Sequence, residues 1–153
     1  MESLVRRLGR IFTPQRKTEQ KTPSPRVRLR PERLERALAT WMEQKGWRKP
    51  ARTLGQVAEE LGTDSSTLYH YFEECIGQDF RTWQTRLRLK DACRMLLEEP
   101  DANAAEIGLR AGFSNRSNFA RQFRAYIGCT PLQWRKEARL SRDIRAPEND
   151  YVV

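Results

Sequence analysis

The chain has 153 residues, room for one domain of ordinary size or two very small ones. Lys and Arg number 29 against 20 Asp and Glu, and the resulting charge of +9 favours nucleic acid or an anionic membrane surface as a partner. The three cysteines are widely spaced and there is one histidine, which argues against a disulfide framework and a zinc site. No apolar run approaches the ~18 residues of a membrane-spanning helix, and no signal peptide is evident. We therefore expect a cytoplasmic protein.

Residues 1–30 form a basic arm with nine basic and two acidic residues, which leaves the rest of the chain at only +2. The apolar positions that fall near one face of a short helix are Leu4, Leu8, Ile11 and Phe12. This segment has three interpretations: a partner-docking helix, a membrane-surface helix, or a frayed terminus, since so short a helix with an internal Gly9 is marginal. Four prolines in residues 13–31 indicate an extended linker, and we predict that the whole arm is disordered.

Helical patterns follow one another from Pro31 onward. The first ends at Gly46, and Thr53 with Gln56 has the spacing of a capping box for the second. Asp64 can cap a third helix, which ends at Gly77. The apolar residues on the predicted core side are Leu34, Leu38, Trp41 or Met42, Leu54, Val57, Ala58, Leu61, Leu68 and Phe72.

A long helix of about 20 residues is predicted between Asp79, which caps it, and Pro100, which ends it. Its expected apolar contacts come from Phe80, Trp83, Leu87, Cys93, Leu96 and Leu97. Asn103 then caps a short helix that leads to Ala111.

The stretch 111–131 indicates the recognition half of a helix-turn-helix. Gly112 ends one helix and Ser114 can cap the next, on which Phe119, Phe123 and Ile127 form one apolar stripe. Side chains able to reach base edges and phosphates lie off that stripe: Arg116, Ser117, Asn118, Arg121 and Gln122.

A last helix begins with the capping box Thr130–Gln133, with Pro131 in its first position. Leu132, Trp134 and Leu140 are expected to pack it. Residues 141–153 are predicted to be a flexible tail, so the folded domain is expected over residues 31–140.

The chain repeats itself at an offset of 50 to 51 residues. At offset 50, the aligned pairs are Val57 with Ile107, Ala58 with Gly108, Leu61 with Ala111 and Gly62 with Gly112. At offset 51, they are Leu68 with Phe119, Phe72 with Phe123 and Gly77 with Gly128. The pattern predicts two helix-turn-helix units joined by the long helix. That helix would be ~30 Å long, close to one turn of DNA, so both recognition helices could enter successive major-groove segments.

The second copy (Ile107, Ala111, Gly112, Phe113, Ser114, Phe119, Phe123, Tyr126, Gly128, Thr130, Pro131, Trp134 and Arg135) is similar to the signature of the AraC/XylS family of bacterial transcription regulators. The first copy, from Val57 to Leu97, resembles that family's first unit and linker helix. The resemblance runs from about Thr53 to Arg135. It implies a seven-helix, all-α DNA-binding domain that recruits or positions RNA polymerase at promoters, and hence a regulator rather than an enzyme.

Two departures from the family pattern stand out. Glu73 and Glu74 follow the phenylalanine of the first recognition helix, where family members usually carry basic residues, and no Lys or Arg lies between Asp64 and Phe80. Gly108 replaces a common alanine, which should loosen its helix by ~1 kcal/mol. Because longer members carry a further ligand-binding or dimerisation domain, the chain is either a stand-alone DNA-binding member or a fragment of a longer sensor-regulator.

The predicted DNA-binding residues lie on both recognition helices: Ser66, Thr67, Tyr69 and His70 on the first, and Asn115, Arg116, Ser117, Asn118, Arg121, Gln122 and Arg124 on the second. Arg116 and Arg121 suit guanine or phosphate, and Asn118 and Gln122 suit adenine. The competing interpretation is that these residues form an ordinary solvated helix face. For the first helix this interpretation is stronger, because the nearby Glu73 and Glu74 weaken its attraction to phosphate. The long helix adds possible phosphate contacts from Arg81, Arg86, Arg88, Lys90 and Arg94.

Two other functions compete with a sequence-specific regulator. A DNA-repair alkyltransferase with a zinc-bound acceptor cysteine would need a cysteine cluster and an acceptor flanked by Pro and His, which the sequence lacks. An RNA-binding or non-specific nucleic-acid-binding protein would use the basic arm and discriminate little between duplexes. We therefore expect no catalytic, cofactor or metal site, and a monomer that binds double-stranded promoter DNA in the bacterial nucleoid.

Overall fold

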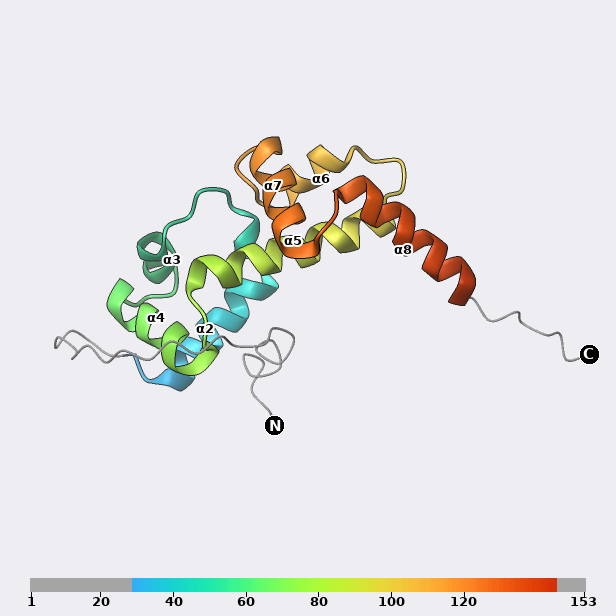
Figure 1. Ribbon diagram of the computed structural model, residues 1–153. Helices are drawn as coiled ribbons and strands as arrows, with labels where there is room; N and C mark the ends of the chain where they lie inside the picture. The colour runs from blue at the N-terminus through green and yellow to red at the C-terminus, as the bar shows by residue number, and fades with distance from the viewer. Residues whose placement is uncertain (1–28, 146–153) are drawn as a thin grey trace, which may run out of the picture. The chain divides into compact units, whose positions relative to one another are not determined.

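The computed structural model describes residues 29–145, and within that range it contains seven α-helices and no strand (Figure 1). The expected all-α fold is confirmed. The chain divides into two compact units, unit 1 ending at Leu87 and unit 2 beginning at Arg88, and one continuous helix passes from the first into the second. No helix in the described range is long and apolar enough to span a membrane. The interpretations of residues 1–28 and 146–153 lie outside the described residues.

Unit 1 contains α2 (Pro31–Glu43), the 3₁₀ turn η1 (Gly46–Arg48), α3 (Leu54–Glu60), α4 (Ser65–Tyr71), the π-helical turn η2 (Phe72–Ile76) and the first part of α5 (Phe80–Glu98). The capping box at Thr53 and Gln56 is confirmed: the Gln56 N–H donates to Thr53 Oγ1 at 3.2 Å, and the Thr53 N–H donates to Gln56 Oε1 at 3.0 Å. The first helix stops at Glu43, before the predicted Gly46. Gly46 has another role, because a Cβ there would lie 2.2 Å from the Trp41 ring.

An aromatic cluster from three elements forms the centre of unit 1. The Phe72 ring lies 5.0 Å from Trp83 and 5.3 Å from Phe80, and Trp41 stacks on Trp83 at 6.2 Å. The Trp41 indole N–H donates to Glu60 Oε2 at 3.0 Å, which ties α2 to α3. Apolar residues of α2, α3 and α4 close around this cluster, so unit 1 has its own core.

Unit 2 contains the remainder of α5, α6 (Ala104–Arg110), α7 (Arg116–Ile127) and α8 (Pro131–Arg145). Phe119 lies between Phe113 at 5.1 Å and Phe123 at 5.5 Å, and Phe123 meets Trp134 at 6.2 Å. The α5 side chains buried here are Leu89, Ala92, Met95 and Leu96, of which the sequence pattern identified only Leu96. Unit 2 thus also has a core of its own.

The sequence repeat is a structural repeat. The two turns begin at Gly62 and Gly112, with φ of 74° and 106°, and both recognition helices end at glycines with positive φ, Gly77 and Gly128. The second turn is one residue longer than the first, which accounts for the change of offset from 50 to 51. The cap of α7 is therefore Asn115 and not the expected Ser114: Asn115 Oδ1 accepts from the Asn118 N–H at 2.7 Å. Asn115 corresponds to Asp64 at an offset of 51.

The C-terminal expectations need correction. Ile127 is 38% exposed and does not complete the buried stripe of α7, since Gly128 ends the helix there. Leu132 and Leu140 are 63% and 55% exposed, so of the three predicted packing residues of α8 only Trp134 reaches the core. The helix also continues through Arg145, five residues into the segment expected to be a tail.

Candidate nucleic-acid interface

The first recognition helix, α4, is capped by Asp64. Its Oδ1 accepts from the Thr67 N–H and its Oδ2 from the Thr67 hydroxyl, both at 2.9 Å. These bonds from Thr67 lower the pKa of Asp64, because they stabilise the carboxylate. The Thr67 hydroxyl is therefore engaged within the turn, which makes Thr67 a capping partner and weakens its case as a base contact.

The exposed face of α4 carries the other predicted contacts of unit 1. Ser66 is exposed, Tyr69 is 49% exposed, and His70 is half-buried with its ring edge against Tyr69 at 5.5 Å. On the opposite side, Leu68 and Tyr71 enter the core. The structure thus places these three polar side chains on the outer side of a helix held in the geometry of a helix-turn-helix.

The end of this first recognition helix is acidic. Glu73 and Glu74 lie in η2, where the helix widens to π geometry, and both are exposed. Neither forms an ion pair within residues 29–145. Their charges repel phosphate and lie at the negative end of the helix dipole.

The second recognition helix, α7, has the opposite electrostatic character. Arg116, Arg121 and Arg124 are exposed, and α7 contains no acidic residue. Ser117 is also exposed and Gln122 is half-buried, while Phe119 and Phe123 anchor the inner side. Five predicted contacts therefore lie on the outer side of α7, among them the three guanidinium groups.

Two predicted contacts on α7 have structural roles as well. Asn115 is the N-cap, so its side-chain oxygen is occupied. Asn118 donates from Nδ2 to Ser114 Oγ at 3.2 Å and accepts at Oδ1 from Arg121 Nη2 at 3.1 Å. The sequence pattern could not reveal that the Asn118 amide is engaged at both ends.

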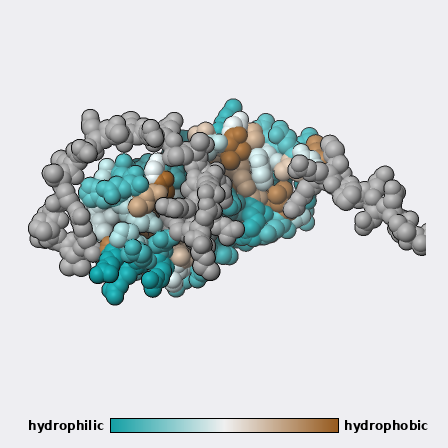
Figure 2. All heavy atoms as spheres, turned by 90° about the horizontal axis from the view of Figure 1, so that it is seen from below, coloured by the Kyte–Doolittle hydropathy of each residue, from teal (hydrophilic) through white to brown (hydrophobic). Residues whose placement is uncertain are grey.

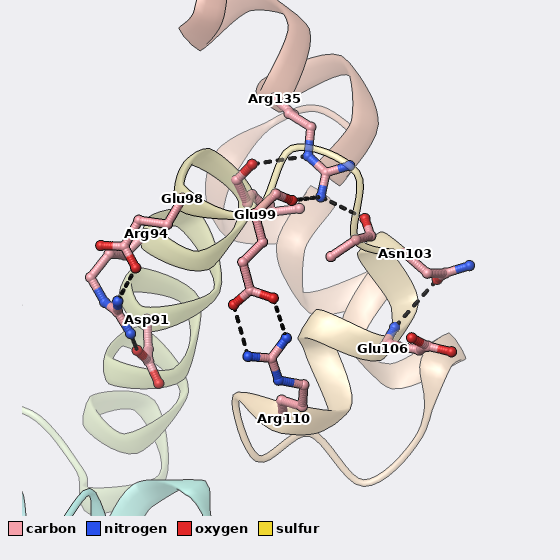
Figure 3. A network of polar contacts seen from close by, with 10 residues as sticks. Asp91, Arg94, Glu98, Glu99, Asn103, Glu106, Arg110 and Arg135 are labelled. Carbon is pink, nitrogen blue, oxygen red and sulfur yellow. Dashed lines mark hydrogen bonds and ion pairs between the residues drawn. The ribbon is translucent and has the colours of Figure 1, made fainter.

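Arg135, a residue of the family signature for which the sequence predicted no role, is buried beside the end of α5 (Figure 3). Arg135 of α8 is 8% exposed and donates from Nε to the Leu96 carbonyl at 3.0 Å. Its Nη2 donates to the carbonyls of Glu99 at 3.3 Å and Ala102 at 2.8 Å. The guanidinium thus binds the Leu96 carbonyl in the last turn of α5, where position 100 is a proline and has no N–H to donate, and two carbonyls of the loop that follows.

An ion pair joins α6 to the same end of α5. Arg110 makes two hydrogen bonds to Glu99, at 2.6 and 2.8 Å, as Figure 3 shows. This contact raises the pKa of Arg110, because the neighbouring carboxylate favours the charged form. Together with Arg135, it fixes α6 and α8 on α5 and so supports the helix pair that presents α7.

The basic residues of α5 are less available than the sequence suggested. Arg94 pairs with Asp91 at 2.9 Å and with Glu98. Burial lowers the pKa of Arg88 to about 10, and Arg86 is half-buried. Arg81 and Lys90 are exposed, so these two are the better candidates for phosphate contact.

All three cysteines are free thiols, and residues 29–145 contain no group of three His, Cys, Asp or Glu side chains that could hold a metal ion. Burial, aided by nearby Cys129, raises the pKa of Cys93 to about 12, which makes that thiol a poor nucleophile. Figure 2 shows a mostly hydrophilic face interrupted by small hydrophobic patches.

Comparison with known proteins agrees with this geometry. Residues 57–137, just over half of the chain, match the helix-turn-helix domain family. The chain is 31% identical over 84 residues to the Msm operon regulatory protein of Streptococcus mutans, and 30% identical over 86 residues to the melibiose operon regulatory protein of Escherichia coli. These alignments cover 55% and 56% of this chain, but only 30% and 28% of those relatives.

A solved structure has a similar fold. The C-terminal domain of AraT, a response regulator from Geobacillus stearothermophilus, has a TM-score of 0.61 and 27% identity, covering 69% of this chain and 84% of that one. The residues that match the helix-turn-helix family, 57–137, include both turns, both recognition helices and α5. The chain therefore belongs to the AraC-type helix-turn-helix family of transcription regulators.

Proposed function

We propose that this protein regulates transcription by binding promoter DNA with two recognition helices, of which α7 provides most of the affinity and α4 adds selectivity. The observation that carries the proposal is the outer side of α7, with three exposed arginines and no acidic residue, set on a buried Phe119–Phe123 stripe. The exposed Glu73 and Glu74 support the weaker role of α4, because they repel phosphate.

The two units differ in cap, in helix length and in charge, so one chain should read two unlike half-sites as a monomer. The relatives are named as operon regulators, and on that basis we propose contact with RNA polymerase at a promoter in the bacterial cytoplasm. A footprint showing a symmetric palindrome occupied by two chains would contradict the monomer.

The test begins with selection of a preferred duplex from a random pool, followed by titration of that duplex and a scrambled one at one stated salt concentration. Arg121→Ala should weaken binding to the selected duplex by about 1–3 kcal/mol and relax preference at one base pair. His70→Ala should weaken it less. Arg36→Ala, which removes an exposed arginine from α2, is the matched control and should change little.

Equal affinity for selected and scrambled duplexes would favour a non-specific or RNA-binding protein. An effect of His70→Ala as large as that of Arg121→Ala would make α4 the stronger contact and contradict the proposed division of roles.

A further inference from the structure

The start of α7 contains a chain of two side-chain hydrogen bonds that joins the turn to the recognition surface. Arg121 Nη2 donates to Asn118 Oδ1 at 3.1 Å, and Asn118 Nδ2 donates to Ser114 Oγ at 3.2 Å. The Asn118 backbone is held as well, since its N–H donates to the cap residue Asn115 at 2.7 Å. Asn118 is therefore restrained at its backbone and at both ends of its amide.

We propose that Asn118 is a positioning residue, which orients the Arg121 guanidinium for base recognition and does not itself read a base; this inference rests on the proposed function. An asparagine that reads adenine presents its amide oxygen and nitrogen together to the base edge. Here the oxygen is directed to Arg121 and the nitrogen to Ser114. These two bonds use one of the two lone pairs of the oxygen and one of the two N–H groups of the nitrogen, and they fix the direction in which the amide points.

Arg121 keeps its recognition capacity in this arrangement. A guanidinium has five N–H donors in a planar fork, and the bond to Asn118 uses one of them. The remaining donors still allow a bidentate contact with guanine O6 and N7. A long side chain that is oriented before binding loses less conformational freedom on the DNA.

The other two arginines of α7 differ in this respect. Arg116 and Arg124 are exposed, and within the described part of the chain neither makes a hydrogen bond or ion pair through its side chain. A mobile arginine suits phosphate, which accepts contacts from many directions, whereas a base edge demands one geometry. Arg121 is thus the arginine of α7 that is prepared for base readout.

The first experiment is a double-mutant cycle of Asn118→Ala and Arg121→Ala, read out as affinity for the selected duplex and for a panel with each base pair replaced in turn. We expect Asn118→Ala to lower affinity by about threefold to tenfold, the range of a single hydrogen bond. It should remove preference at the same base pair as Arg121→Ala and add little in the Arg121→Ala background. Loss of preference at a different base pair, with additive effects, would mean that Asn118 reads a base and would overturn the proposal.

Asn118→Asp is the conservative variant. Its carboxylate still accepts from Arg121, so preference at that base pair should be retained, while the new negative charge should weaken binding to all duplexes alike. Ser114→Ala, which removes only the outer bond, should give a smaller loss at the same base pair. Loss of the preference in Asn118→Asp would contradict the positioning role.

A second measurement needs no DNA. The NMR order parameter of the Arg121 Nε–H should fall in Asn118→Ala and stay near the wild-type value in Asn118→Asp, with the Arg124 Nε–H as internal control. An unchanged Arg121 value in Asn118→Ala would overturn the inference, even if the protein binds DNA selectively. A wild-type chain that discriminates between no duplexes would refute the proposed function, and the NMR comparison would still decide whether Asn118 orders Arg121.

Discussion

Replacing Gly108 with alanine should destabilise unit 2, although intrinsic helix propensity predicts the reverse. Gly108 lies in α6, and a Cβ there would lie 2.3 Å from Cγ and Cδ1 of Phe119 and 2.9 Å from its Cβ. Phe119 is 1% exposed and is confined between Phe113 and Phe123. The ring cannot yield without disturbing its neighbours, so α6 and α7 would have to separate.

The magnitude follows from two opposing contributions. Alanine gains about 1 kcal/mol of helix propensity over glycine. Overpacking a closed core costs about 1–3 kcal/mol, and contacts this short place Gly108→Ala toward the upper end. The expected net change is a loss of about 1–2 kcal/mol in the free energy of unfolding.

The assay is urea denaturation followed by far-UV circular dichroism. Gly55→Ala in α3 is the matched control, because the Cβ there would meet only the Ser65 hydroxyl at 3.3 Å and Thr53 Oγ1 at 3.9 Å. That variant should be at least as stable as the wild type. In the Phe119→Ala background the alanine at 108 should cost less, measured against Phe119→Ala alone, because that change removes Cγ and Cδ1, the two atoms that the new methyl group would meet at 2.3 Å. A Gly108→Ala protein more stable than the wild type would refute the argument.

The remaining predictions concern charge and capping. Arg135→Met should lower the free energy of unfolding by about 2–4 kcal/mol, because the carbonyls of Leu96, Glu99 and Ala102 lose the hydrogen bonds that Arg135 donates. A loss of less than about 0.5 kcal/mol in denaturation would contradict this. Changing both Glu73 and Glu74 to Lys should tighten binding to all duplexes and lower the ratio of the affinity for the selected duplex to that for the scrambled one. Weaker binding to both duplexes would contradict the proposal that these two charges weaken the contact of α4 with phosphate. Deleting residues 1–28, which carry eight basic and two acidic residues, should flatten the slope of log K against log salt; an unchanged slope would favour a membrane or partner role for the arm. Hydrogen bonding depresses the folded pKa of Asp64, so its contribution to stability is complete above its unfolded pKa of about 3.9 and is lost as pH falls below that value toward the folded pKa. Asp64→Ser should therefore lose less stability than the wild type on acidification below about pH 4.

The sequence by itself determined the elements that depend on local chemistry. Spacing alone identifies the features whose partners lie within four positions of each other. These are the capping boxes at Thr53 and Thr130, the cap at Asp64 and the helix end at Gly128. The repeat at 50 to 51 residues identified both helix-turn-helix units, because each unit needs the same glycines and the same apolar stripe. The outward placement of Arg116 and Arg121 follows from that stripe.

Only the tertiary structure decided which parts of each pattern are used. Leu132 and Leu140 have a helical period, but no element of the described chain covers them, so they remain exposed. Gly108 appears unfavourable in the sequence, yet it is required where the Phe119 ring approaches α6.

Two polar residues show the same limit. Arginine is usually a surface residue, and the burial of Arg135 depends on carbonyls 33 to 39 positions away in the sequence. Asparagine is a residue type that reads adenine, but the Asn118 amide is hydrogen-bonded to Ser114 and Arg121. The sequence does not reveal the side-chain directions that make these bonds possible. Hydrophobic period and capping are properties of one segment, whereas close approach, burial and side-chain pairing depend on how segments pack against each other.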